Sequence, residues 1–292
     1  MRPQCVLLLY KKSAYQIYFL KRGSPLFGKQ NFFSKSELSQ FQTSHKEHYK
    51  TLQEVERVLK DARVFYRKRC RGGKIDFAAF DFAVTVGGDG TFLEAARGLK
   101  SQIALGVNSD PNNSVGRFCE ATRKTFAEIF QRLLRDRFKI KSLPRIQLTL
   151  KLKNKTLTMN VLNDILICHQ NPAAMSRYYM TLDDIKEEQR SSGIWISTAA
   201  GSSGAIHSAG GKVLPADSKK NQYKPRELYH VSGNHYQLKG DVVLLKGSLV
   251  IRSLMQGGVI FVDGSHTQYP FNLGDTAHIS HSPVPLRIVD TH

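Results

Sequence analysis

The chain has 292 residues, 41% of them hydrophobic and 23% charged, which provides enough apolar material for one large or two small domains and excludes bulk disorder. Lysine and arginine number 43 against 24 acidic residues, so the net charge of +19 predicts attraction to the phosphates of a nucleotide, a nucleic acid or an anionic membrane. No apolar run reaches the roughly 20 residues that cross a bilayer, and the four cysteines form no C-x-x-C pair, so we expect no membrane span, disulfide or zinc site.

The first half of the chain alternates short apolar strands with helices. The apolar start is too short for a signal peptide before charge returns at Lys11, so it predicts a strand and a cytoplasmic protein. We predict strands at residues 6–9, 80–86 and 103–107, a polar loop at 24–44, and helices at 45–62, 91–99 and 122–137. This order is typical of a parallel sheet covered on both faces.

The second half changes character near Pro144 and shows mostly strands and turns. We predict strands at 146–152, 157–167, 178–182, 194–197, 242–245, 249–251 and 259–262, a hairpin turn at Asp263-Gly264, and an insertion or long loop at 212–237. A last strand within 277–289 could join either half. The expected domains are therefore an α/β nucleotide-binding domain at 1–142, a β-rich substrate-binding domain at 143–275, and a returning tail at 276–292.

The first candidate site is the glycine turn, residues 87–90, which follows an apolar strand and precedes a helix. Gly87, Gly88 and Gly90 leave room for a ligand to approach the backbone amides, and amides at a helix start bind phosphate oxygens. Asp89 would lie at the carboxyl edge of the sheet, where it could accept a proton or hold Mg²⁺. The structural alternative is a tight turn in which Asp89 or Thr91 caps the helix. The P-loop pattern is absent.

The second candidate is the polar pair Asn163-Asp164, which interrupts an apolar strand. The two side chains would face opposite sides of a regular strand unless a bulge intervenes, and ribose hydroxyls would suit both. A turn between two short strands is the alternative.

The third candidate is the serine-rich segment, residues 197–211, which follows Gln189 to Gly193 and Trp195. Small side chains there expose the backbone to a ligand, and the alternative is a flexible linker.

Together these clusters resemble the NAD kinase family, whose signatures are a G-G-D-G-T turn, an N-[ED] pair and a Gly/Ser/Thr-rich segment ending in S-A-G-G. The loop from Gly106 to Arg117, which contains Asn108-Ser109-Asp110-Pro111, and the run Gln189 to Gly193 are most similar to the mitochondrial-type branch. The resemblance covers roughly residues 50 to 290. It implies an α/β domain, a β-rich domain, a site in the cleft between them, and transfer of the γ-phosphate of ATP to the 2′-hydroxyl of the adenosine ribose of NAD.

The resemblance also implies residue roles. Asp89 would be the general base, and Asn163 and Asp164 would bind ribose. The remaining nucleotide contacts would come from Gly87, Gly88, Gly90, Thr91, Asn108, Arg190, Ser192, Ser203, Gly204, Ala205, His207 and Ser208. Arg117, Arg177 and Arg190 are candidate phosphate clamps. Asp164 stands where Glu is commoner, and Ala199-Ala200 and Gly204-Ala205 replace a proline, a threonine and an aromatic residue, which would weaken stacking on NAD.

The expected partners are NAD and ATP, with polyphosphate as an alternative donor, Mg²⁺ carried by the phosphates rather than by a protein metal site, and no tightly bound cofactor. We expect a homodimer or homotetramer without membrane or nucleic-acid partners. Three other functions stay open at this point: a non-catalytic nucleotide sensor of the same fold, a lipid kinase that shares the glycine turn, and a basic nucleic-acid-binding protein.

Overall fold

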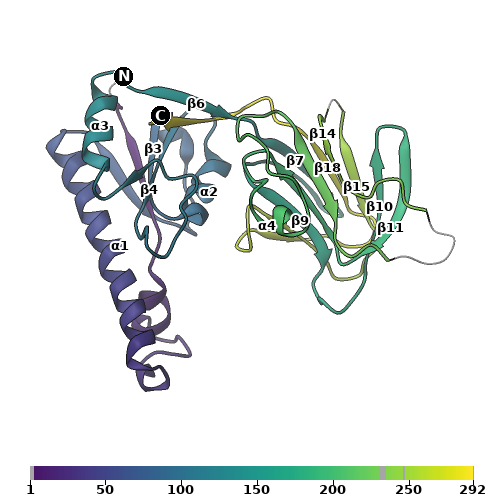
Figure 1. Ribbon diagram of the computed structural model, residues 1–292, viewed down its shortest axis with the longest axis horizontal. Coiled ribbons are helices and arrows are strands. Elements are labelled where there is room, and N and C mark those ends of the chain that lie inside the picture. Colours follow the sequence, from purple (N-terminus) through teal and green to yellow (C-terminus); the bar gives the residue numbers. More distant parts are fainter. Residues whose placement is uncertain (1–2, 230–234, 246, 292) are drawn as a thin grey trace. The chain divides into compact units, whose positions relative to one another are not determined.

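The computed structural model describes residues 3–229, 235–245 and 247–291 and divides the chain into two compact units (Figure 1). The first unit comprises Met1–Lys141 and Arg287–His292, and the second comprises Ser142–Leu286. Among the described residues, no helix combines the length and the apolar character that crossing a membrane requires.

The first unit is an α/β fold around a mostly parallel sheet. Its helices are α1 (Lys35–Asp61), α2 (Asp89–Gly98) and α3 (Phe126–Leu134), with short helical turns at Gln16–Leu20, Gln30–Phe32 and Phe77–Ala79. Its strands are β1 (Val6–Tyr10), β2 (Tyr66–Cys70), β3 (Phe82–Gly87), β4 (Ile103–Asn108), β5 (Ala121–Thr122), β6 (Lys139–Leu143) and β19 (Leu286–Asp290). The sheet order is β2-β1-β3-β4-β19-β6, with β5 beside β4.

Helices cover both faces of this sheet. Leu52 of α1, Phe130 of α3 and Val84 of β3 belong to one buried apolar cluster, so α1 and α3 share a face. Figure 1 shows α2 on the opposite face. The central strands β3 and β4 are buried along their whole length, as the apolar runs at 80–86 and 103–107 predicted.

Three predictions for this unit need correction. Helix α1 begins at Lys35 rather than His45, because Ser34 and Glu37 form a capping box in which each side chain bonds the other's backbone amide. The predicted loop at 24–44 is therefore wrong from residue 35 onward. Helix α3 is shorter than the predicted 122–137. The basic run after residue 66 contains strand β2, which sequence reasoning missed along with β5 and β6.

The second unit consists of two antiparallel sheets. Their orders are β11-β10-β15-β18-β7-β8 and β14-β13-β12-β9-β16-β17. The strands are β7 (Ile146–Leu152), β8 (Lys155–Val161), β9 (Asp164–His169), β10 (Ser176–Leu182), β11 (Ile185–Ser191), β12 (Ile194–Thr198), β13 (Asn221–Pro225), β14 (Asp241–Val243), β15 (Leu249–Ser253), β16 (Gly258–Val262), β17 (Gln268–Pro270) and β18 (Thr276–His281). The short helix α4 (Ala205–Ser208) lies in the serine-rich segment.

Apolar side chains from both sheets of this unit form one core. Ile146, Leu148 and Leu150 of β7 are fully buried and alternate with partly exposed residues, so one face of the strand points inward. These three residues belong to the same buried cluster as Ile165 and Ile196 of the other sheet. Buried side chains of this size each contribute about 1.5–3 kcal/mol to folding.

The strand predictions for this unit differ from the structure at several places. The predicted strand 157–167 is two strands, β8 and β9, separated at Leu162 and Asn163. The predicted insertion at 212–237 contains β13, and its residues 230–234 lie outside the described residues. The last predicted strand, 277–289, is also two strands: β18 pairs with β7 in the second unit, and β19 pairs with β4 in the first. Strands β11, β13 and β17 were not predicted.

Candidate functional site

The glycine turn lies where β3 meets α2, at the carboxyl edge of the parallel sheet. Gly88 is the N-cap residue of α2 and Asp89 is its first residue, two positions earlier than the predicted helix start. No side chain caps this helix, so the alternative in which Asp89 or Thr91 serves as the cap is wrong. The first-turn amides of a helix have no acceptor within the helix, and they are therefore available to an anion.

Close packing explains the glycine at position 88. A Cβ atom on Gly88 would lie 2.5 Å from the Ser114 hydroxyl oxygen, closer than real Cβ contacts allow. Ser114 belongs to the loop that follows β4, so this loop packs directly against the turn. A side chain at position 88 would push the two apart.

Asp89 is half-buried, and one of its carboxylate oxygens is held. Its Oδ1 accepts a hydrogen bond from the Phe118 backbone amide at 2.9 Å. Within the described part of the chain, no ion pair involves Asp89 and no hydrogen bond reaches its Oδ2. The carboxylate is thus oriented through one oxygen while the other can accept a proton.

The neighbouring cysteine does not compete as a nucleophile. Burial, together with the nearby charge of Asp89, raises the pKa of Cys119 to about 12. The thiol therefore stays protonated at neutral pH, and a thiolate is the nucleophilic form.

Asn108, predicted to contact nucleotide, shapes the loop after β4. Its Oδ1 accepts from the Asp110 amide at 3.1 Å, and its Nδ2 donates to the Ser114 carbonyl at 2.8 Å. A nucleotide contact of Asn108 stays a prediction.

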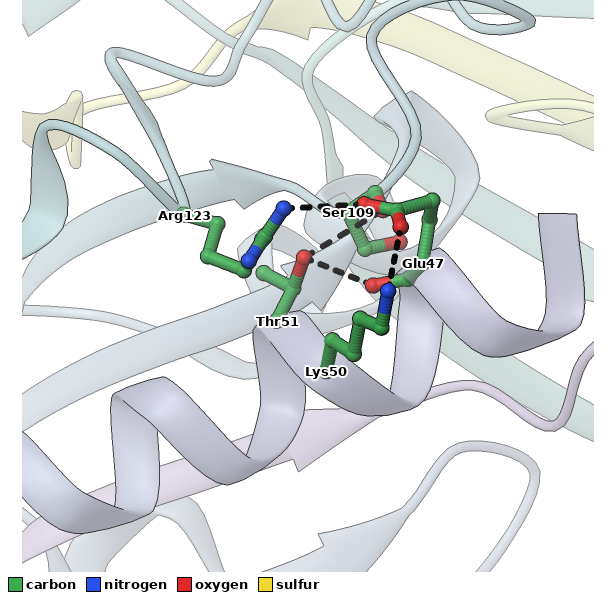
Figure 2. Close-up of polar contacts among 5 residues, drawn as sticks. All are labelled: Glu47, Lys50, Thr51, Ser109 and Arg123. Atoms are coloured by element: carbon green, nitrogen blue, oxygen red, sulfur yellow. Dashed lines mark hydrogen bonds and ion pairs between the residues drawn. The ribbon is translucent and has the colours of Figure 1, made fainter. Parts of the chain in front are cut away.

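Helix α1 also contacts the loop that follows β4, and the sequence analysis did not predict these contacts. Figure 2 shows Thr51 donating to the carbonyls of Glu47 and Ser109, while Lys50 and Arg123 both pair with Glu47. The contact with Ser109 is 3.4 Å and the pair between Arg123 and Glu47 is 3.1 Å.

Two further side chains of α1 reach this loop. Ser44 donates to Asp110 at 2.5 Å, and the buried His48 bonds the Ser109 hydroxyl at 2.9 Å. Ser44, His48 and Thr51 are spaced by four and three residues, so they share one helical face. His48 and Thr51 lie within the predicted helix 45–62 and Ser44 directly precedes it, so this spacing is the signal that the sequence offers.

In the second unit, the strand break (residues 162–164) is held by hydrogen bonds to Asp263, which is distant in the sequence. Asp263 Oδ1 accepts from the amides of Asn163 at 2.7 Å and Leu162 at 3.1 Å, and the Asp263 amide donates to the Asp164 carbonyl at 2.8 Å. The break therefore lies between two short strands, β8 and β9, which is close to the alternative of a turn between two strands, and the buried Asp263 carboxylate holds its backbone amides.

Asn163 and Asp164 interact with each other at the break. Asn163 Nδ2 donates to Asp164 Oδ2 at 3.0 Å. Burial, and secondly the charge of Asp263, raise the pKa of Asp164 to about 7, while a hydrogen bond from the Gly264 backbone opposes the shift. Asp164 therefore changes protonation near neutrality, so this carboxyl can either donate or accept a hydrogen bond.

The serine-rich segment folds back onto the strand break and is not a free linker. The Thr198 hydroxyl donates to the Leu162 carbonyl at 2.5 Å and accepts from the Gly201 amide at 3.0 Å. A Cβ atom on Gly201 would overlap the Asn163 carbonyl, and one on Gly204 would lie 3.9 Å from the side chains of Asn163 and Asp164. Because Gly201 and Gly204 have no side chains, the backbone of the serine-rich segment can lie close to Asn163 and Asp164.

The predicted contact residues around Gly204 are open to solvent. Ser203, Ala205, His207 and Ser208 are exposed, and the His207 ring bonds the Gly211 carbonyl at 3.0 Å. They are accessible to a ligand, and their contacts with one stay predictions.

Arg190 and Ser192 are not brought to the strand break. In the pairing of β12 with β9, Ser197 lies opposite Asp164 and Ile194 lies opposite Ile167, so Ser192 lies beyond the far end of the strand. Arg190 pairs with Glu188 at 3.3 Å.

The chain is similar to several known proteins. A sequence model described as the ATP-NAD kinase N-terminal domain matches residues 28–138. A probable NADH kinase of Oryza sativa subsp. japonica is 33% identical over 231 residues, covering 72% of this chain and 70% of the relative. An NADH kinase of Arabidopsis thaliana is 34% identical over 235 residues, covering 73% of each chain.

The chain belongs to the NAD kinase family. Two solved structures share its fold. An NAD kinase from Archaeoglobus fulgidus in complex with ATP aligns with a TM-score of 0.70 at 20% identity, covering 99% of this chain and 94% of that chain. A yeast NADH kinase complexed with NADH aligns with a TM-score of 0.72 at 16% identity, covering 99% and 84%.

Family membership confirms the resemblance drawn from the three motifs, together with the fold class of an α/β domain plus a β-rich domain. It does not favour the lipid kinase or the nucleic-acid-binding alternative. Assignment to the mitochondrial-type branch stays a prediction, and the two plant NADH kinases are consistent with it.

Proposed function

We propose that this NAD kinase family member transfers the γ-phosphate of ATP to the 2′-hydroxyl of the adenosine ribose of NAD or NADH. The observation that carries the proposal is the position of Asp89, in the first turn of α2 at the carboxyl edge of the parallel sheet, with one oxygen oriented and the other available. NADH is included as an acceptor because the two plant relatives are named NADH kinases.

In this reaction the 2′-oxygen attacks the γ-phosphorus and forms a new P–O bond, the bond to the bridging oxygen breaks, and ADP leaves. Asp89 Oδ2 takes the proton of the hydroxyl. A ribose hydroxyl is a weak acid, so a positioned base contributes roughly 10²- to 10⁴-fold. The remaining acceleration would come from positioning and from stabilising charge on the phosphates.

The residues of the strand break and the serine-rich segment fit the acceptor. Asn163 and Asp164 offer donors and acceptors that suit ribose hydroxyls, and the backbone around Gly204 leaves room beside them. Ser203, Ala205, His207 and Ser208 would contact the rest of the dinucleotide. Arg190 and Ser192 are kept as proposed contacts, although they lie beyond the far end of β12.

Mg²⁺ fits this chemistry as a metal carried by the nucleotide. Within the described residues, no group of three or more His, Cys, Asp or Glu side chains could hold a metal ion, and Mg²⁺ commonly binds through substrate phosphates with one or two carboxylates. When bound, it would neutralise charge on the phosphates of ATP. We also propose a cytoplasmic homodimer or homotetramer, which light scattering and fractionation would test.

The experiment is to incubate the purified chain with NAD or NADH and with Mg-ATP or polyphosphate, and to assay NADP and NADPH. Formation of either product that depends on the donor supports the proposal. Binding of NAD without any product would favour the non-catalytic sensor instead.

A further inference from the structure

Arg145 lies at the same end of its sheet as the strand break. It directly precedes β7, and the pairing of β7 with β8 ends at Ile146 and Val161, so Leu162 is the next residue of the partner strand. On its other side β7 pairs with β18, and the Ser282 amide donates to the Arg145 carbonyl at 2.8 Å. Strand register therefore places the backbone of Arg145 between the break and the end of β18.

The Arg145 side chain is almost completely buried, with 1% of its surface exposed. Its Nε donates to the Val284 carbonyl at 2.9 Å. Burial lowers the pKa of Arg145 to about 10, and the charge of Asp263 opposes this shift, so the guanidinium stays charged at neutral pH. A buried cation is costly unless an anion compensates it, and Asp263 supplies that anion.

Asp263 is buried as well, and its carboxylate holds the strand break. Its Oδ1 accepts from the backbone amides of Leu162 and Asn163, and the Asn163 side chain in turn donates to Asp164 Oδ2. Asp164 is a second buried acid, and the charge of Asp263 contributes to its raised pKa. A site that buries two acids needs a positive charge nearby, which Arg145 provides.

We propose that Arg145 is a positioning residue for the dinucleotide acceptor: its guanidinium compensates the buried charge of Asp263, which holds the strand break where its polar side chains meet the ribose hydroxyls. This inference rests on the proposed function for the identity of the acceptor. Because Arg145 is buried, it acts through Asp263 and not through a contact with the substrate. A buried carboxylate that loses its countercharge either takes up a proton or moves toward water, and both outcomes weaken its hold on the two amides.

The test compares Arg145→Met, Arg145→Lys and the double variant Arg145→Met/Asp263→Asn. Calorimetry measures the affinities for NAD and Mg-ATP, and steady-state kinetics gives the KM values for NAD and ATP separately. We expect Arg145→Met to weaken NAD binding and to raise KM for NAD by about tenfold or more, with the affinity for Mg-ATP nearly unchanged. Arg145→Lys keeps the positive charge beside Asp263 and should restore most of the NAD affinity.

Met180→Ala is the control for destabilisation alone. Met180 is fully buried in the same core, in β10, which pairs with neither of the strands at the break. Its truncation leaves a cavity and lowers stability, whereas the NAD affinity of the folded variant should stay close to that of the unsubstituted chain. An equal loss of NAD affinity in Met180→Ala and Arg145→Met would overturn the positioning role.

The double variant separates positioning from stability. Removing both buried charges should raise the free energy of unfolding above that of Arg145→Met, measured in urea, because no unpaired charge stays buried. NAD affinity should stay low, because the neutral amide of Asp263→Asn is a weaker acceptor for the two backbone amides. Recovery of NAD affinity together with stability would overturn the positioning role. If Arg145→Met does not fold, the double variant decides.

Failure of this inference and failure of the proposed function give different results. Normal NAD affinity in folded Arg145→Met would overturn the positioning role even in a chain that forms NADP. NAD binding that depends on Arg145 in a chain that forms no NADP would support the positioning role while the proposed function fails.

Discussion

Two aspartates in this molecule occupy opposite surroundings. Asp89 is half-buried at a helix start, with Lys11 and Arg71 at the same sheet edge. Asp164 is 5% exposed beside a second acid, Asp263, which is 6% exposed. The first setting suits an anion and a proton acceptor near phosphates, and the second suits a carboxyl that shares hydrogen bonds with neutral hydroxyl groups. Two residues of the same type thus differ in chemistry because their surroundings differ.

The largest expected effect on stability comes from Asp164. Its pKa is raised in the folded chain to about 7 from 3.8, so its favourable contribution is present below pH 3.8 and is lost as pH rises through 7. The Asp164→Asn side chain does not ionise, so the variant lacks this pH-dependent loss. As pH rises from about 4 to about 8, its free energy of unfolding should therefore increase relative to that of the unsubstituted chain, by up to about 4 kcal/mol. Urea unfolding at several pH values measures it.

The control for this prediction is Asp217→Asn, at an exposed position in the same unit. A stability difference for Asp164→Asn that does not change with pH would contradict the assignment of a raised pKa.

His48 gives a pH dependence of the opposite sign. Burial lowers its pKa from 6.5 to about 4, so its contribution is present above pH 6.5 and is lost as pH falls through 4. The loss reaches about 3 kcal/mol. His48→Gln should flatten the decline in stability below pH 6.5 in urea unfolding, whereas the exposed His207→Gln should leave it in place. Equal acid sensitivity in both variants would rule out His48 as its source.

Gly201→Ala tests the backbone packing at the strand break. The new methyl group would overlap the Asn163 carbonyl, so we expect a stability loss of about 2 kcal/mol and weaker NAD binding. Thermal unfolding and calorimetry measure these effects. Gly247→Ala is the control, because no atom lies within 4 Å of the position its Cβ would take. Normal NAD affinity in Gly201→Ala would separate this segment from the acceptor site.

Ser34→Ala should have the smallest effect. It removes the capping box at the start of α1, which costs about 1 kcal/mol, while Ser39→Ala on the exposed surface of the same helix should cost less. Thermal unfolding measures both. Equal losses in the two variants would mean that the cap adds nothing to the stability of α1.

Local signals predicted part of this structure. The apolar runs that became β3 and β4 and the glycine turn were readable, because buried parallel strands and the turn between strand and helix have local patterns. The start of α1 could also have been predicted, because Ser34 and Glu37 have the spacing of a capping box. Strand β2 was not predicted because its sequence is mostly charged. Its side chains alternate between half-buried and exposed, as at a sheet edge.

The rest depends on contacts between distant residues. The sequence 157–167 resembles one strand, and the break within it is held by distant residues: Asp263 bonds the amides of Leu162 and Asn163, and Thr198 bonds the Leu162 carbonyl. Asp263-Gly264 was predicted only as a turn, and nothing in its local sequence indicates which backbone its carboxylate holds. That Lys11 and Arg71 leave the sheet at the same edge likewise follows from strand register.

The proposed role of Asp89 is tested by comparing Asp89→Asn with Asp164→Asn in the same assay of NADP formation, with NAD affinity measured by calorimetry. We expect Asp89→Asn to lower kcat by roughly 10²-fold or more while NAD affinity survives, and Asp164→Asn mainly to weaken NAD binding. Near-normal turnover in Asp89→Asn would show that Asp89 is not the group that accepts the proton.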